Sequence, residues 1–155
     1  MKNERGQQNI TTPTYLLDIR NPVALVCSLI EWLCGNAHIS LEGDLSNLDH
    51  TCVAGIKLDE WSVLRRNTIW PRQDFIILPL ETETTKIIKS RILHTVGLRD
   101  RVIHVQIEKG EELVFCAFDN FAAECVWIAQ SVGDQFLQDL IGKNVLRSFK
   151  SNPYD

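Results

Sequence analysis

Two thiols and two carboxylates lie within eleven residues of one another in the stretch FCAFDNFAAEC, residues 115–125. Thiols can act as nucleophiles or bind Zn²⁺, and carboxylates can bind cations or attract a basic partner. A zinc site needs Cys and His in closely spaced pairs, because a tight turn or a helix face must deliver two ligands to one tetrahedron. The chain contains no CxxC, HxxxH or HExxH motif. We therefore expect no metal site.

A catalytic cysteine needs exposure and a neighbour, such as an imidazolium, that lowers the pKa of its thiol. In this chain only His104 could serve Cys116 in this way. A two-residue turn at Lys109-Gly110 would place His104 opposite Phe115, and Cys116 would then point to the other face of the sheet. We therefore expect the thiols to be packing residues and the protein not to be an enzyme. A thiol-dependent hydrolase or transferase that uses Cys116 or Cys52 is the first alternative.

Tryptophan and arginine alternate in the segment WSVLRRNTIWPR, Trp61–Arg72. This mixture can stack on bases and contact phosphates. The tryptophans can equally enter the core while the arginines lie over apolar surface or pair with carboxylates. The chain is acidic and has no RNA-binding motif, so the second interpretation is favoured. A nucleic-acid accessory protein that uses this segment is the second alternative. Glycine-rich phosphate-binding motifs are absent, and we expect no cofactor.

Acidic and aromatic side chains are concentrated between residues 108 and 127. Carboxylates beside aromatic rings suit docking on a basic protein, because charge accelerates the encounter and aromatic rings anchor the complex. The same pattern is typical of solvated loops that keep an edge strand from pairing with other chains. The residues predicted to bind a partner are Asp119, Phe121, Glu124, Glu108, Glu111, Glu112 and Trp127.

Length and charge restrict the class of protein. The chain has 155 residues, of which 45% are hydrophobic and 23% charged, as in an ordinary single-domain globular protein. The net charge is −4, and the outer thirds of the chain are acidic. Direct binding to nucleic acid or an anionic membrane is therefore not expected, whereas a basic protein suits this charge. Five widely spaced cysteines and an apolar run too short to cross a bilayer predict a cytoplasmic protein.

Periodicity and turn residues predict the elements that must position these side chains. Asn21-Pro22 predicts the start of a helix over residues 22–34, and DFIILPL predicts a strand over 74–80 with Pro79 near its end or at a sheet edge. Residues 46–72 give no clear pattern. The other expected elements are a strand near 39–41, a helix over 82–96, three antiparallel strands between 102 and 129, a helix opened by a Ser131–Asp134 capping box, and a last strand near 145–149.

This order predicts an α+β fold: a largely antiparallel sheet that includes a C-terminal three-strand meander, with about three helices packed on one face. We expect one domain over residues 13–150, with flexible tails at 1–12 and 151–155. The expected function is that of a small, acidic protein-binding module. The most concrete hypothesis is a bacterial immunity or antitoxin type of inhibitor, which neutralises a basic, toxin-like protein such as a nuclease by covering its active cleft.

Overall fold

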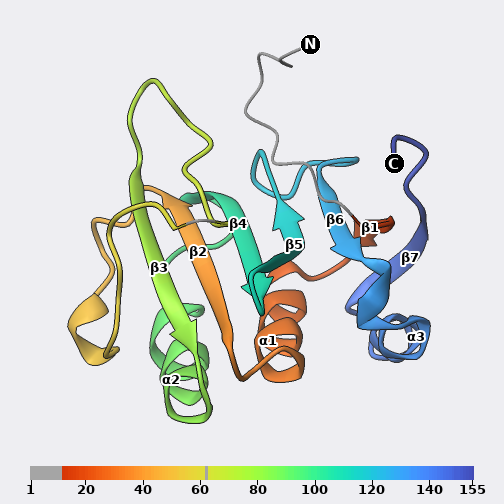
Figure 1. Ribbon diagram of the computed structural model, residues 1–155, viewed down its shortest axis with the longest axis horizontal. Coiled ribbons are helices and arrows are strands. Elements are labelled where there is room, and N and C mark those ends of the chain that lie inside the picture. The colour runs from red at the N-terminus through yellow and green to blue at the C-terminus, as the bar shows by residue number, and fades with distance from the viewer. Residues whose placement is uncertain (1–11, 62) are drawn as a thin grey trace.

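A computed structural model describes residues 12–61 and 63–155, and it confirms the α+β class. Seven strands form one sheet in the order β3-β2-β4-β5-β6-β1-β7, and every neighbouring pair is antiparallel (Figure 1). Among them, β4, β5 and β6 are consecutive in the chain and adjacent in the sheet. The strands are β1 (Thr14–Ile19), β2 (Ala37–Gly43), β3 (Asp74–Leu80), β4 (Val102–Lys109), β5 (Glu112–Ala117), β6 (Val126–Ala129) and β7 (Leu146–Ser151).

Three helices pack on one face of this sheet, which we call the helical face (Figure 1). They are α1 (Pro22–Trp32), α2 (Thr82–Ile87), which continues as a π-helical turn over Ile88–Ile92, and α3 (Asp134–Gly142). Apolar side chains from all three helices share one core with inward-facing residues of the strands. Leu29 of α1, Leu41 of β2 and Phe115 of β5 are fully buried in this core. Residues 50–52 and 130–132 form short 3₁₀ segments.

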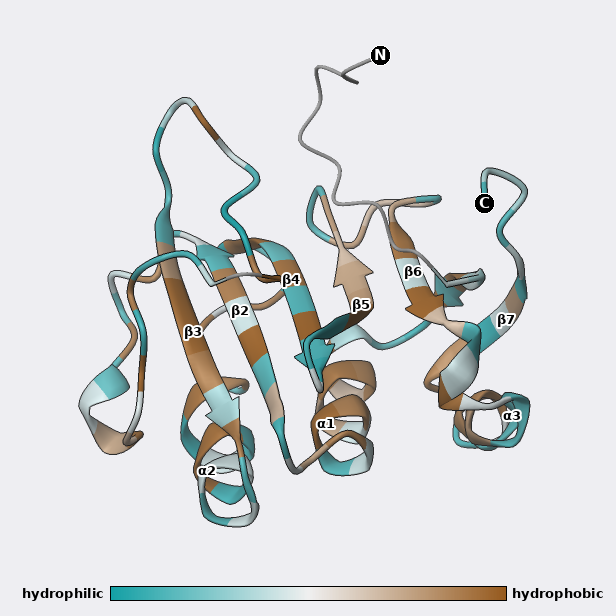
Figure 2. Cartoon of the chain, viewed as in Figure 1, coloured by the Kyte–Doolittle hydropathy of each residue, from teal (hydrophilic) through white to brown (hydrophobic). Residues whose placement is uncertain are grey.

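The opposite face of the sheet, which we call the second face, is covered at one edge by residues 57–61 and 63–68, which we call the covering segment. Lys57 pairs with Ile77 of β3 through two backbone hydrogen bonds of 3.0 and 2.7 Å. Leu64 is fully buried against Phe75 and Ile77. Because β3 is apolar on both faces, it is almost continuously brown in Figure 2, whereas β7 at the other edge is mostly hydrophilic. Part of the region that gave no clear pattern in the sequence therefore covers the edge strand β3.

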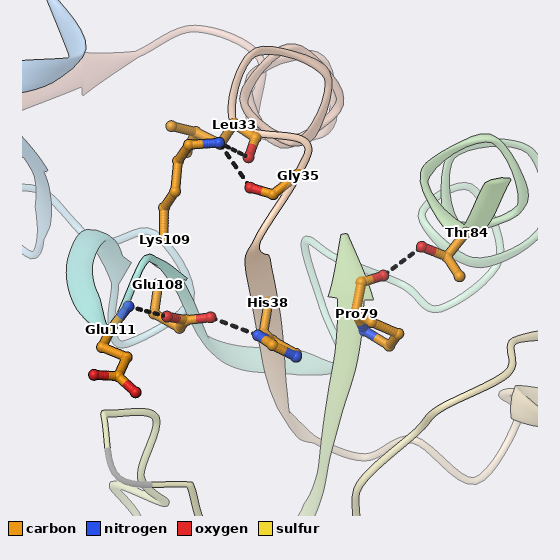
Figure 3. A network of polar contacts seen from close by, with 8 residues as sticks. All are labelled: Leu33, Gly35, His38, Pro79, Thr84, Glu108, Lys109 and Glu111. Carbon is orange, nitrogen blue, oxygen red and sulfur yellow. Dashed lines mark hydrogen bonds and ion pairs between the residues drawn. The ribbon is translucent and has the colours of Figure 1, made fainter. Parts of the chain in front are cut away.

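The first helix shows how local sequence positions the chain. The Asn21 side chain accepts a hydrogen bond from the Ala24 N–H (3.1 Å), as predicted for an N-cap. The helix ends at Trp32, two residues earlier than expected. At this end the Lys109 ammonium donates to the carbonyls of Leu33 (2.9 Å), Cys34 (3.3 Å) and Gly35 (2.8 Å) (Figure 3). A cation at the carboxyl end of the helix satisfies otherwise unpaired carbonyls.

Several elements differ from the prediction. The expected 82–96 helix is α-helical only to Ile87 and continues as a π-helical turn, after which Ile92 and Leu93 are both buried. The Ser131 capping box is wrong, because α3 begins after Gly133, whose φ is +100°. Strand β1 was not predicted at all. The C-terminal tail is tied down, because the Asp155 carboxylate accepts from the Thr14 N–H (2.5 Å). The predicted N-terminal tail, apart from Thr12, lies outside the described residues.

Candidate functional site

The predicted partner-binding residues fall at opposite ends of β5. Glu111 and Glu112 are exposed at the β4–β5 turn, whereas Asp119 and Glu124 are exposed in the loop that joins β5 to β6 (Figure 1). A six-residue strand spans roughly 20 Å. The structure therefore brings Asp119 and Glu124 together with Phe121, and it separates them from the turn. We call residues 118–125 the acidic loop.

The backbone of the acidic loop is held in an unusual conformation. Residues 119–121 have φ angles of +49°, +57° and +59°, which are left-handed values that non-glycine residues rarely adopt. The Phe118 N–H donates to the Cys125 carbonyl (2.9 Å), and the Asn120 N–H donates to the Ile103 carbonyl (2.8 Å). These bonds tie the loop to itself and to the start of β4. The loop therefore presents its carboxylates from a defined backbone.

A hollow of about 370 Å³ lies between the acidic loop and strands β1 and β7. Residues 16–19, 121–124 and 147–150 line it. The Arg147 guanidinium donates to the Asp18 carboxylate (3.0 Å), so these two charges offset each other within the lining. Glu124 brings a further carboxylate to the lining from the acidic loop.

Two predicted residues lie inside the structure, at opposite ends of β5: Trp127 supports the acidic loop, and Glu108 supports the β4–β5 turn. Trp127 is half-buried on the second face, and its ring meets the Phe118 ring edge to face at 5.3 Å. The Glu108 side chain is only 3% exposed, and its carboxylate contacts His38 Nδ1 at 2.5 Å and accepts from the Glu111 N–H (2.9 Å) (Figure 3). Glu108 lies on a strand that other residues cover, so its side chain does not reach a partner directly. This burial corrects the prediction that Glu108 binds a partner.

The hairpin register also corrects the prediction for Cys116. Gly110 and Glu111, both with positive φ (+57° and +66°), form the turn, and a bulge after Ile107 shifts the pairing so that Cys116 lies opposite Gln106. Cys116 therefore shares the second face with His104, whereas the predicted turn had placed the two residues on opposite faces. Cys116 is nevertheless only 1% exposed, and burial raises the pKa of its thiol. Its thiolate, the nucleophilic form, is thus strongly disfavoured.

The other two thiols near candidate chemistry are also poorly disposed to react. Burial, followed by the nearby Asp119 and Glu124 carboxylates, raises the pKa of the Cys125 thiol. Cys52 packs against the main core, and its Sγ lies within hydrogen-bonding distance of the Asp49 carbonyl (3.2 Å). The thiol-dependent alternative named Cys116 and Cys52: the buried Cys116 gives it no support, and the Cys52 thiol is held against the Asp49 carbonyl.

Six polar side chains form a row on the second face of β2 and β4, which we call the polar row. The register pairs them across the two strands: His38 with Glu108, Ser40 with Gln106, and Glu42 with His104. All but the half-buried His38 are buried. Alternation with apolar neighbours indicated only that one face of β4 is polar. Sequence reasoning did not find that a distant segment covers this face.

The polar row anchors the covering segment through the backbone of that segment. The Glu42 carboxylate, in a residue only 1% exposed, accepts from the Asn67 N–H (2.9 Å) and the Thr68 N–H (2.8 Å). The Gln106 amide donates to the Arg65 carbonyl (2.8 Å). Because each of these contacts involves a main-chain group, the segment 65–68 is held in one conformation on the sheet.

His104 joins the covering segment to the acidic loop. Its Nδ1 accepts from the Asp119 N–H (3.3 Å), so the neutral ring carries its proton on Nε2, which lies 3.2 Å from Thr68 Oγ1. Burial lowers the pKa of His104, while the Glu42 and Asp119 carboxylates act in the opposite direction. One neutral imidazole therefore bridges the bases of two surface loops.

Acidification should destabilise the protein through His104. The folded pKa lies below the unfolded value of about 6.5, so the unfolded state binds the proton first. The stability that neutral His104 contributes is therefore complete above about pH 6.5 and falls as the pH drops below this value. We expect the free energy of unfolding by urea to decrease between pH 7.5 and 5 in wild type, and to decrease less in His104→Gln. His94→Gln, at an exposed position, is the control. Equal pH dependence in wild type and His104→Gln would contradict this assignment.

The structure also settles the disposition of most side chains in Trp61–Arg72. The Trp61 ring packs against His38 (4.6 Å between centroids). Arg65 pairs with Glu60 (3.2 Å), and Arg66 donates to the Gln73 carbonyl. These residues follow the packing interpretation that the sequence favoured.

Ile69 and Trp70 behave differently, with exposed fractions of 92% and 86%. The favoured interpretation had placed Trp70 in the core with Trp61, and its exposure corrects that prediction, whereas Ile69 was not singled out. The signal that could have found them is the apolar pair Ile-Trp placed before Pro71 in a segment with neither helical nor strand periodicity.

Across residues 12–61 and 63–155, no three His, Cys, Asp or Glu side chains converge as metal ligands would. None of the helices in this described part combines the length and apolarity that a bilayer crossing requires. No protein family model matches the chain, and no curated protein or solved structure is significantly similar to it. Functional inference therefore depends on the acidic loop, the hollow beside it and the exposed Ile69-Trp70 pair.

Proposed function

We propose that this protein is a binding module that docks on a basic protein through the acidic loop. The observation that carries the proposal is the placement of exposed Asp119 and Glu124 on either side of Phe121 in a loop whose backbone is tied down. A preorganised loop loses little conformational entropy when it binds. Its carboxylates would steer a basic partner, and the neighbouring aromatic ring would anchor it.

The hollow beside the loop suggests what part of the partner is recognised. Leu16 and Leu17 provide apolar lining, and the charged lining residues are two acidic and two basic ones: Asp18, Glu124, Arg147 and Lys150. A lysine or arginine side chain has a matching character, with an apolar stem and a charged end. Such a side chain would place its stem against the two leucines and its charged end at Glu124 of the acidic loop.

In its most concrete form, the proposal is a bacterial immunity or antitoxin type of inhibitor that acts in the cytoplasm. Its partner would be a basic toxin, such as a nuclease, whose active cleft normally attracts phosphates. The Asp119 and Glu124 carboxylates would occupy the positions of those phosphates, and occlusion would require no reactive group in the inhibitor.

Reversing the loop charges tests the proposal, and the chain offers a matched control. Wild type, Asp119→Lys/Glu124→Lys and Glu111→Lys/Glu112→Lys would each be immobilised and exposed to the same bacterial extract. A basic protein should be retained by wild type and by the turn variant, but not by the loop variant. With that protein purified, we expect the loop reversal to weaken binding by about 100-fold or more, since two favourable charge contacts become repulsive. Equal retention by the loop variant, or the absence of any retained basic protein, would rule out this site.

A further inference from the structure

Two large apolar side chains project together from the surface just before β3. Ile69 and Trp70 are 92% and 86% exposed, and Pro71 and Arg72 after them are also exposed. We call residues 69–72 the tip. Single exposed apolar residues are common, but two adjacent ones at this exposure form the kind of anchor that interfaces use.

The tip stands on a fixed base. Immediately before it, the Asn67 and Thr68 N–H groups donate to the buried Glu42 carboxylate. Immediately after it, the Gln73 carbonyl accepts from Arg66, and the Gln73 side chain donates to the Pro71 carbonyl (3.3 Å). Trp70 is therefore presented by a preorganised segment, which lowers the entropic cost of binding.

The tip and the acidic loop emerge from the same end of the sheet. The register pairs the end of β2 with the starts of β3 and β4, and the end of β5 lies beside the start of β4. His104 contacts both bases, at Thr68 and at Asp119. In Figure 1 the segment before β3 rises beyond the strand ends, while the loop between β5 and β6 stays closer to them. This end of the molecule thus has a projection at one side and a lower shelf at the other.

The charges of the two segments are complementary. The tip carries the exposed basic residue Arg72, whereas residues 118–125 contain two carboxylates and no basic residue. The hollow of about 370 Å³ beside the acidic loop has apolar lining from Leu16 and Phe121. The shelf therefore offers an apolar surface to Trp70 and carboxylates to Arg72.

We propose that the tip of one copy docks on the acidic loop of a second copy, so that the protein forms a reciprocal, two-fold symmetric dimer. A two-fold axis at this end of the sheet places each projection over the shelf of the other copy. Trp70 then packs against Phe121 and the hollow, and Arg72 lies near Asp119 and Glu124. Because both contacts form within one pair, the assembly closes and does not grow into a filament.

A second copy explains the tip better than a nucleic acid does. Arg65 and Arg66 are engaged by Glu60 and by the Gln73 carbonyl, whereas binding to a phosphate backbone requires several available cations. This inference goes beyond the proposed function and does not depend on it. If both are correct, the dimer covers the acidic loop, and self-association competes with the basic partner.

Sedimentation velocity on the purified protein tests the dimer without any partner. We expect wild type to pass from monomer to dimer between about 1 and 300 µM. Trp70→Ala should weaken dimerisation by about 30-fold or more, as expected for a central aromatic anchor. Trp32→Ala, which removes a 56% exposed tryptophan on α1, should leave dimerisation unchanged. A monomer throughout this range, or a dimer that Trp70→Ala leaves intact, would overturn the proposal.

A charge exchange makes the test specific to the two segments. Arg72→Glu alone and Glu124→Arg alone should each weaken the dimer, because each variant places like charges at both contacts. An equimolar mixture of the two variants should regain dimerisation, since every contact in the mixed dimer again joins opposite charges. A mixture no tighter than the separate variants would overturn the pairing. Binding of monomeric wild type to single-stranded RNA, lost in Trp70→Ala, would instead assign the tip to nucleic acid.

Different results would contradict the dimer and the proposed function. A monomeric wild type that still retains a basic protein through Asp119 and Glu124 would remove the dimer and leave the proposed function standing. A dimer that depends on Trp70 while no basic protein is retained would do the opposite. Monomeric Trp70→Ala should also retain the basic protein at least as well as wild type does, because its acidic loop is uncovered.

Discussion

Replacing Glu42 by alanine should lower the free energy of unfolding by about 3 kcal/mol, because the substitution leaves two backbone donors without their acceptor. Glu42 is 1% exposed, and its two oxygens accept from the N–H groups of Asn67 and Thr68. These donors belong to the covering segment and face the sheet, where water cannot replace the buried carboxylate without moving the segment. Glu42→Gln keeps one acceptor oxygen and should cost less than Glu42→Ala.

Urea unfolding at neutral pH, followed by circular dichroism, measures this effect. Glu60→Ala is the control, because Glu60 lies in the same covering segment with its side chain 49% exposed and pairs with Arg65. An exposed ion pair contributes little, so this variant should change stability by less than about 1 kcal/mol. A similarly small loss in Glu42→Ala would show that the polar row does not hold the segment. Where Glu42→Ala remains folded, it should also dimerise more weakly, because the base of the tip is released.

Strong local signals allowed several elements to be predicted from the sequence. The Asn21-Pro22 pair identified the start of α1, because the cap and the proline both act within one turn. The run DFIILPL identified β3 at its observed bounds, Asp74–Leu80, and Pro79, predicted to mark a strand end or a sheet edge, lies near the end of an edge strand. In each case the residues that determine the structure lie within the element itself.

Other features depend on partners far away in the chain. Strand β1 is a short run whose neighbours, β6 and β7, follow it by more than a hundred residues. The burial of the polar row was not predicted, because alternation in β4 does not reveal that residues 57–61 and 63–68 cover it. Periodicity within a strand describes which side chains share a face, and it does not identify what lies against that face.

The candidate site was predicted only in part for the same reason. The carboxylates of Asp119 and Glu124 were identified by residue type and spacing, but they were grouped with Glu111 and Glu112 at the far end of β5. The hairpin register was missed because a bulge after Ile107 adds one residue to the pairing. Trp70 was considered within a basic segment, and its exposure follows from packing that the sequence does not display.

Replacing Lys109 by methionine should also destabilise the protein, by about 2 kcal/mol, because its ammonium closes the carboxyl end of α1. Its Nζ lies 2.8–3.3 Å from three carbonyls, those of Leu33, Cys34 and Gly35. Methionine retains much of the apolar stem, so the loss should reflect the charged hydrogen bonds. Thermal or urea unfolding measures the change, and Lys143→Met provides the control, since Lys143 is an exposed lysine at the end of α3.

Lys109 also separates stability from binding. It lies at the β4–β5 turn, at the opposite end of the sheet from the acidic loop and the tip. Lys109→Met should therefore dimerise with the wild-type dissociation constant under conditions where it is folded, in contrast to Glu42→Ala, which acts on the base of the tip. If Lys109→Met weakened dimerisation as much as Glu42→Ala does, the effect of Glu42 on binding would have to be assigned to lower stability in general. An unchanged constant in Lys109→Met would instead place that effect in the polar contacts beneath Trp70.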